Sequence, residues 1–271
     1  MEPRVASSRR PAELTGVVER LARGRLLVLL DVDGTLAPIA PTPEAAVVPP
    51  ETRLAIAKLV SRPDVTVALV SGRAAADARR MVAVEGVWAL GNHGIETVSP
   101  SGATTIDERV ARFREPLAGA ARRLHDQLAA IPGARVEDKT WTLSVHYRQV
   151  APDAVMTVQA AVRSMAAETG LRMTEGKRVL ELRPPVEVDK GTAALAFVRR
   201  LAPSGEAAVL YVGDDRTDED AFAALRREMP GALTVRVAGG DDDAHRTTSA
   251  ELVVGDVVAV RELLDRLVAA R

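Results

Sequence analysis

Short, unbroken apolar runs recur along the chain, each followed by polar residues or glycine and, in most cases, then by a helical pattern. These runs cover residues 26–30, 65–70, 87–90, 207–212 and 233–237. Apolar runs without alternation are typical of strands buried on both faces, as in a parallel sheet covered by helices. The helical patterns cover residues 51–60, 74–83, 191–201, 218–227 and 257–270. This succession predicts an α/β fold with a doubly wound, Rossmann-like parallel sheet.

Residues 106–185 follow a different pattern. We expect helices over 108–130 and 153–168, and strands over 171–174 and 179–183. Between the helices, residues 141–148 alternate, which places Trp141 on one face of a strand and Arg148 on the other. Such alternation is typical of a sheet with one packed face and one free face. We therefore expect a catalytic core formed by residues 1–105 and 186–271, with a smaller inserted α+β domain at 106–185.

Composition narrows the possible functions. The 271 residues include no cysteine, which excludes disulfides, thiolate metal sites and a cysteine nucleophile. A net charge of -1 and 3% aromatic residues argue against nucleic-acid binding. Four histidines argue against a histidine-rich metal centre, whereas 37 Asp and Glu residues favour carboxylate chemistry. No apolar stretch approaches the roughly 20 residues of a spanning helix, and no signal-peptide core is visible. We expect a cytoplasmic protein with no membrane partner and no obligate protein partner.

Polar side chains stand directly after the buried runs, at the place where open α/β sheets bind ligands. They are Asp31, Asp33, Ser71, Arg73, Asp214 and Asp215, joined by Lys190 at the start of a helix. Carboxylates brought together at strand ends need a cation, and oxygen ligands with room for water suit Mg²⁺. Taken singly, an Asp here can equally cap a helix or fill a turn. Only the combination indicates a site.

In order along the chain, these segments resemble the four motifs of the haloacid-dehalogenase-like phosphatase superfamily. The motifs are Asp31-Val32-Asp33-Gly34-Thr35-Leu36, Ser71-Gly72-Arg73, Lys190-Gly191 and Gly213-Asp214-Asp215-Arg216-Thr217-Asp218-Glu219-Asp220. The resemblance implies that Asp31 attacks phosphorus and that Asp33 acts first as general acid and then as base. It also implies that Ser71 hydrogen-bonds the phosphoryl group and that Lys190 neutralises its charge.

The same resemblance implies a Mg²⁺ ion held by Asp31, by the backbone carbonyl of Asp33 and by Asp214. The parts played by Asp215 and Asp218 stay open. One of them could reach the metal through water and the other could orient Lys190, or either could be purely structural.

Further segments are similar to the trehalose-6-phosphate phosphatase family. They cover residues 31–39, 91–96, 136–139, 146–148, 176–184 and 213–222, and the likeness extends over about 26–256. It implies a disaccharide phosphate substrate and a substrate-selecting role for the inserted domain. The implied substrate contacts are Glu137, Lys139, Arg148, Lys177 and Glu181 in that domain, with Arg73, Asn92, His93 and Gly94 in the core. A solvated sheet face with surface ion pairs is the alternative for Glu137, Lys139 and Arg148. His146 is left out of the catalytic set.

The expected activity is Mg²⁺-dependent hydrolysis of trehalose 6-phosphate to trehalose and phosphate through an aspartyl-phosphate on Asp31. Hydrolysis of another sugar phosphate, of the sucrose phosphate or mannosyl-phosphoglycerate type, is the alternative, followed by a non-catalytic sugar-phosphate sensor. A phospho-accepting receiver domain would be about half this length. We also expect a helix or a lead-in over 5–20 and a solvated turn or second cation patch at 241–243. No synthase-like domain precedes the motifs, which predicts a stand-alone phosphatase.

Overall fold

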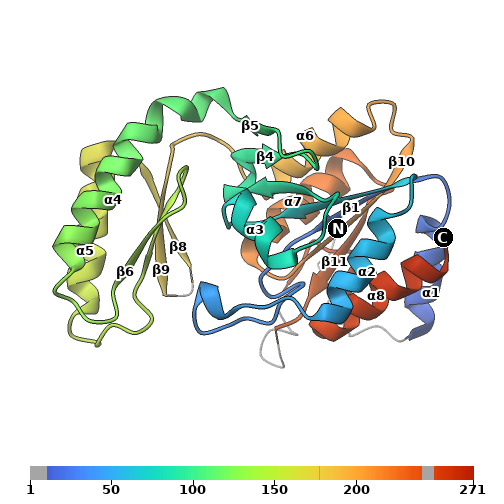
Figure 1. Cartoon of the computed structure of the whole chain (residues 1–271), viewed down its shortest axis with the longest axis horizontal. Helices are drawn as coiled ribbons and strands as arrows, with labels where there is room; N and C mark the ends of the chain where they lie inside the picture. The colour runs from blue at the N-terminus through green and yellow to red at the C-terminus, as the bar shows by residue number, and fades with distance from the viewer. Residues whose placement is uncertain (1–10, 177, 240–246) are drawn as a thin grey trace. The chain divides into compact units, whose positions relative to one another are not determined.

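The computed structural model describes residues 11–176, 178–239 and 247–271. The chain divides into two compact units, and Figure 1 labels many of their helices and strands. One unit extends to Thr105 and resumes over Val188–Arg271, and the other is Ile106–Glu187. No helix in the described parts of the chain combines the length and apolar character needed to cross a membrane. The acidic stretch 241–243 lies outside the described residues.

An eight-stranded sheet forms the centre of the first unit, in the order β12-β11-β10-β1-β2-β3-β4-β5. Its strands are β1 (Arg25–Leu30), β2 (Val65–Val70), β3 (Trp88–Gly91), β4 (Glu96–Val98), β5 (Thr104–Ile106), β10 (Ala207–Gly213), β11 (Leu233–Val237) and β12 (Leu252–Val254). Neighbouring strands from β12 to β3 run parallel, and β4 runs antiparallel to β3. The predicted doubly wound α/β core is confirmed, with an antiparallel extension at one edge.

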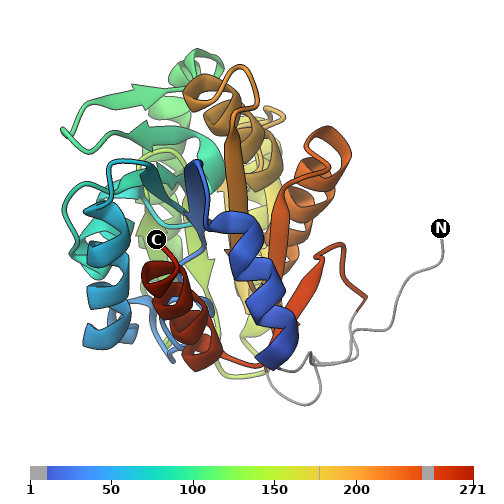
Figure 2. The same cartoon turned by 90° about the vertical axis from the view of Figure 1, so that its right-hand side faces the viewer.

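Helices cover both faces of this sheet, and Figure 2 shows α1 and α8 side by side on one of them. The helices are α1 (Pro11–Leu21), α2 (Pro50–Val60), α3 (Ala75–Val82), α6 (Lys190–Leu201), α7 (Arg216–Glu228) and α8 (Val257–Ala269). Leu26, Val28 and Leu30 pack in one apolar cluster with α1, α2, α3 and α8, and Leu27 and Leu29 pack in another with α6 and α7. Burial on both faces is why β1 reads as an unbroken apolar run.

The second unit is a four-stranded antiparallel sheet packed on two helices. The strands are β6 (Arg135–Asp138), β7 (Leu143–His146), β9 (Val179–Arg183) and β8 (Arg172–Gly176), in that spatial order. The helices are α4 (Arg114–Leu128), which follows a 3₁₀ helix at Glu108–Phe113, and α5 (Val155–Thr169). Leu143 and Val145 pack with Leu180 and Leu182 against apolar residues of both helices. The inserted α+β fold with one packed sheet face is therefore as expected.

Three details of the second unit differ from the sequence prediction. The predicted strand 141–148 is only four residues long, and Arg148 lies in the turn after it, where strand alternation no longer places a side chain. The predicted helix from residue 108 opens as a 3₁₀ helix and becomes α-helical at Arg114. Strand β6 has half-buried and exposed residues and no apolar run, so its pattern did not predict a strand.

Candidate active site

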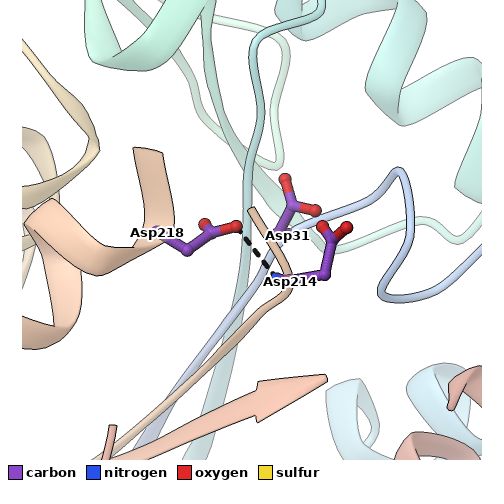
Figure 3. A group of neighbouring side chains, drawn as sticks. All are labelled: Asp31, Asp214 and Asp218. Carbon is purple, nitrogen blue, oxygen red and sulfur yellow. Dashed lines mark hydrogen bonds between the residues drawn. The ribbon is translucent and has the colours of Figure 1, made fainter. Parts of the chain in front are cut away.

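Three carboxylates converge at the carboxyl ends of neighbouring strands. Asp31 follows β1 and Asp214 follows β10, and the Asp31 N–H donates to the Val212 carbonyl at 2.9 Å. Asp218 comes from the first turn of α7. One carboxylate oxygen from each of the three lies within 4.8 Å of the others, and Figure 3 shows Asp31 and Asp214 pointing the same way. The sequence led us to expect the carboxylates of Asp31, Asp33 and Asp214 in one small volume. Asp31 and Asp214 do lie together because β1 and β10 are adjacent and parallel, but the third carboxylate is that of Asp218.

Two glycines permit this approach. Gly34 has a φ of +82°, and a Cβ there would overlap the Asp214 carboxylate. Gly213 lies where a Cβ would overlap the Asp218 side chain. A larger residue at either position would displace one of the three carboxylates, so both glycines are needed for packing. Gly34 is needed for its backbone conformation as well.

Asp218 is completely buried and organises the loop that carries Asp214. Its Oδ2 accepts the backbone N–H groups of Asp214 and Asp215, both at 3.0 Å, and its Oδ1 accepts the Tyr211 hydroxyl at 2.8 Å. Asp215 caps α7, accepting the N–H groups of Thr217 and Asp218. Strand β10, the loop and α7 are thus tied together through one carboxylate.

Lys190 lies between these carboxylates at the beginning of α6. Its Nζ is 2.7 Å from Asp31 Oδ1, 2.9 Å from Asp218 Oδ1 and 3.8 Å from Asp215 Oδ1, and its side chain is 2% exposed. Asp189 caps α6 by accepting the Thr192 N–H at 2.7 Å. Burial lowers the pKa of Lys190, but the negative charges of Asp215, Asp218 and Asp31 raise it by more. The pKa of Lys190 therefore lies well above its usual value. The ammonium therefore stays charged.

The donor set fits a divalent cation. Burial, with the charges of Asp218 and Asp215, raises the pKa of Asp214 to about 7. Burial also raises the pKa of Asp31, against the lowering effect of Lys190. Asp214 Oδ1 is buried and accepts no hydrogen bond from the described residues. An unpartnered carboxylate oxygen beside two further carboxylates is a site for a hard, oxygen-loving ion such as Mg²⁺.

Ser71 follows β2, which is adjacent to β1, and is 1% exposed. Its N–H donates to the Leu90 carbonyl and its carbonyl accepts the His93 N–H, each at 2.9 Å. Its Oγ accepts the Arg73 N–H at 3.1 Å. These bonds hold the Ser71–Arg73 loop at the same edge of the sheet as Asp31.

Asn92, His93 and Gly94 form a 3₁₀ turn that supports this loop. Asn92 and His93 both have positive φ values, of 51° and 58°. The Asn92 N–H donates to the Arg73 carbonyl at 2.7 Å, and its Nδ2 donates to Glu96 Oε1 at 2.8 Å. Gly94 packs on Ala193 of α6, where a Cβ would overlap the alanine methyl. The turn therefore links the Ser71–Arg73 loop to the helix that carries Lys190.

Asp33 and Arg73 form a two-pronged ion pair. Arg73 Nε donates to Asp33 Oδ2 and Nη2 donates to Asp33 Oδ1, both at 2.6 Å. The Asp33 carboxylate is consequently turned to Arg73 and is not one of the three clustered carboxylates. The resemblance implied a substrate contact for Arg73, and in the structure its guanidinium donates to Asp33 and to the Pro43 carbonyl.

Three candidate residues of the second unit, Glu137, Lys139 and Glu181, make two side-chain contacts on its polar sheet face, one of them with His146. Glu137 and Glu181 lie opposite Ser144 from either side, so the three form one row across β6, β7 and β9. Glu137 Oε2 is 2.7 Å from His146 Nε2, and Glu181 Oε1 accepts Lys139 Nζ at 3.2 Å. Burial raises the pKa of Glu137, but the His146 hydrogen bond and the Lys139 charge lower it by more.

Two further candidates of the second unit are Arg148 and Lys177. Arg148 is exposed in the turn after β7, and Lys177 lies outside the described residues. Sequence reasoning also missed two supporting groups of the first unit. Tyr211 belongs to an apolar run, so the pattern does not reveal that its hydroxyl makes a hydrogen bond. Glu96 Oε1 accepts hydrogen bonds from Asn92 Nδ2 and the Ala75 N–H. The only sequence signal for Glu96 is its four-residue spacing from Asn92.

Comparison with known proteins agrees with these motifs. The sequence model of the family described as trehalose-phosphatase matches residues 29–255. A trehalose-phosphate phosphatase from Mycolicibacterium paratuberculosis is 39% identical over 256 residues, which are 94% of this chain and 65% of the relative. One from Mycobacterium tuberculosis is 38% identical over 254 residues, 93% of this chain and 63% of the relative. The chain thus spans slightly less than two thirds of the length of these relatives.

The structural likeness has the same extent. The crystal structure of a trehalose-6-phosphate phosphatase related protein superimposes with a TM-score of 0.77 at 26% identity, covering 90% of this chain and 97% of that one. A haloacid dehalogenase-like hydrolase from Bacteroides thetaiotaomicron shares the fold, with a TM-score of 0.61 at 13% identity over 89% of this chain and 99% of that one. With the four motifs placed at one sheet edge and the family match covering most of its length, the chain belongs to the trehalose-phosphatase family.

Proposed function

We propose that the chain hydrolyses trehalose 6-phosphate to trehalose and inorganic phosphate at the Asp31 cluster. The observation that carries this proposal is the buried contact of 2.7 Å between Lys190 Nζ and Asp31 Oδ1 beside Asp214 and Asp218, in a member of this family. Lys190 places a positive charge beside the buried Asp31 carboxylate, which favours the ionised form that a nucleophile needs.

In the first step, a carboxylate oxygen of Asp31 attacks phosphorus and the bond between phosphorus and the sugar oxygen breaks. The departing oxygen takes a proton from Asp33, so that the sugar leaves as an alcohol. In the second step Asp33 takes a proton from water, and the water oxygen attacks phosphorus. The acyl-phosphate bond to Asp31 then breaks and releases phosphate. Asp33 ends each cycle in its starting protonation state.

The remaining core residues counter the negative charge of the phosphoryl group. Lys190 supplies a fixed positive charge, and the Ser71 hydroxyl supplies a hydrogen bond. Asp31, Asp214 and the Asp33 carbonyl would hold Mg²⁺, for which the unpartnered Asp214 Oδ1 argues. When bound, Mg²⁺ supplies charge neutralisation that lets a carboxylate approach a phosphate dianion.

The inserted segment 106–185 would select the sugar. Glu137, Lys139 and Glu181 present carboxylate and ammonium groups on one sheet face, and such groups hydrogen-bond sugar hydroxyls well. Arg148 and Lys177 would add further contacts. We propose these residues as the disaccharide contacts, with Asn92, His93 and Gly94 shaping the core side.

The test is phosphate release from trehalose 6-phosphate, sucrose 6-phosphate and glucose 6-phosphate, with Mg²⁺ and with a chelator. The variants are Asp31→Asn and, as a matched control, Asp265→Asn, which removes only a surface pair with Arg261. Phosphate release should be fastest from trehalose 6-phosphate. In the presence of Mg²⁺ it should vanish in Asp31→Asn and persist in Asp265→Asn. Equal rates on all three substrates would contradict the substrate, and saturable binding without phosphate release would identify a sensor instead.

A further inference from the structure

Arg73 makes two hydrogen bonds to Asp33, the residue that transfers protons in the proposed reaction. Arg73 is only two residues beyond Ser71, and its guanidinium is mostly buried, with 16% of the side chain exposed. Both Asp33 oxygens accept from it at 2.6 Å. Fork-to-fork pairing of this kind defines the orientation of a carboxylate as well as attracting it.

Arg73 is itself held from three sides. Its Nη2 also donates to the Pro43 carbonyl at 2.9 Å, its N–H donates to Ser71 Oγ at 3.1 Å, and its carbonyl accepts the Asn92 N–H at 2.7 Å. The Pro43 bond restrains the guanidinium itself, and the two backbone bonds restrain the residue that carries it. Arg73, restrained in this way, sets the position of the Asp33 side chain.

The backbone of Asp33 is fixed as well. The Gly34 N–H donates to the Ala37 carbonyl at 2.8 Å, and Asp33 and Ala37 form an isolated bridge. With the backbone held, the remaining freedom of Asp33 lies in its side-chain torsions, of which the last is broad in an unrestrained carboxylate. The two bonds from Arg73 remove that freedom.

We infer that Arg73 is a positioning residue that orients Asp33 for proton transfer in both steps of the reaction. This inference rests on the proposed function. A carboxylate oxygen has two lone-pair directions and Arg73 uses one on each oxygen, so the pairing by itself leaves Asp33 able to exchange a proton. Proton transfer by a well-placed group accelerates reactions by roughly 10²–10⁴-fold, and its loss on misplacement is correspondingly large.

The experiment is a double-mutant cycle with Arg73→Gln, Asp33→Asn and the double variant. Each is measured by kcat/KM on trehalose 6-phosphate and on p-nitrophenyl phosphate. The nitrophenolate group leaves without a proton, so its kcat/KM does not need the acid. Arg73→Gln should lower kcat/KM on the sugar phosphate by roughly 10–10²-fold and change it less than about threefold on the aryl phosphate. In the Asp33→Asn background, Arg73→Gln should add nothing.

Arg73→Lys retains the charge without the fork and should recover only part of the loss. Arg79→Gln is the matched control, because Arg79 bonds only the Ser99 and Pro100 carbonyls in the described contacts, and it should behave as wild type. An undiminished effect of Arg73→Gln in the Asp33→Asn background would show direct substrate contact and overturn the inference. A higher kcat/KM in Arg73→Gln would show that the pair holds Asp33 in an inactive position, and this result would also overturn the inference. A wild-type chain inert towards all phosphate monoesters would overturn the proposed function itself.

Discussion

Lys190 Nζ lies 2.7 Å from Asp31 Oδ1, although the two residues are 159 positions apart along the chain. The contact joins the end of β1 to the beginning of α6, and both side chains are almost completely buried. A second contact of Lys190, with Asp218, places the same ammonium between two carboxylates. Such a charge arrangement is costly to assemble and more costly to leave incomplete.

We therefore predict that Lys190→Met abolishes most of the activity and lowers stability. Loss of the ammonium removes charge stabilisation of the phosphoryl group, and kcat should fall by roughly 10²–10³-fold. Asp31 and Asp218 also lose their buried counter-charge, which lowers the melting temperature. Lys58→Met is the control, since Lys58 is exposed in the last turn of α2. Lys190→Met with wild-type kcat would refute the role of this contact.

Gly34→Ala should lower the free energy of unfolding by more than the strain of its positive φ alone would. A Cβ at residue 34 would overlap the Asp214 carboxylate, whereas Gly102 has a similar φ of +88° with nothing within 4 Å of a Cβ. Gly102→Ala therefore measures only the strain of a positive φ, about 1–3 kcal/mol. Denaturant unfolding should show a larger loss for Gly34→Ala, and calorimetric titration should show weakened Mg²⁺ binding. Equal losses in both variants would show that residue 34 tolerates the methyl group.

Stability should depend on pH through Asp214. Its pKa rises from 3.8 to about 7 on folding, so the folded chain binds this proton more tightly than the unfolded chain. The contribution of this carboxyl to stability is then largest at low pH and decreases as pH rises between these two values. Mg²⁺ competes with the proton, so it should raise the melting temperature more at about pH 8 than at about pH 5.5.

Asp214→Asn is the comparison for this measurement and should remove most of the pH-dependent Mg²⁺ effect. Thermal unfolding with a chelator and with Mg²⁺ at both pH values provides the readout. The same Mg²⁺ shift in Asp214→Asn as in wild type would place the ion elsewhere.

Glu137→Gln should separate sugar recognition from phosphoryl chemistry. The Glu137 carboxylate is held by His146 on the polar face of the second unit's sheet. Removing its charge should raise KM for trehalose 6-phosphate about tenfold, as the loss of a charged hydrogen bond does. The kcat/KM for p-nitrophenyl phosphate should not change. Glu168→Gln on the surface of α5 is the control. A matched loss on both substrates would argue against a role in selecting the sugar.

The elements that could be predicted from the sequence are those with a strong one-dimensional pattern. Strands β1, β2 and β10 are buried on both faces and so appear as unbroken apolar runs. Strands β4, β5 and β12 have only three residues each, which is too short for a pattern to show, and β6 has no buried residue. Short edge strands depend on the neighbour that pairs with them.

Sequence alone identified Asp31, Ser71, Lys190 and Asp214 as candidates, because their segments resemble known motifs. Three of them follow buried strands, and the carboxyl ends of parallel strands lie at one sheet edge. Only the tertiary structure decided which side chains in and around the site contact one another. Arg73 faces Asp33, and Tyr211 supports Asp218 from within an apolar strand. The physical reason is that a hydrogen bond depends on side-chain torsions and on strand order, and neither has a period that can be read along the chain.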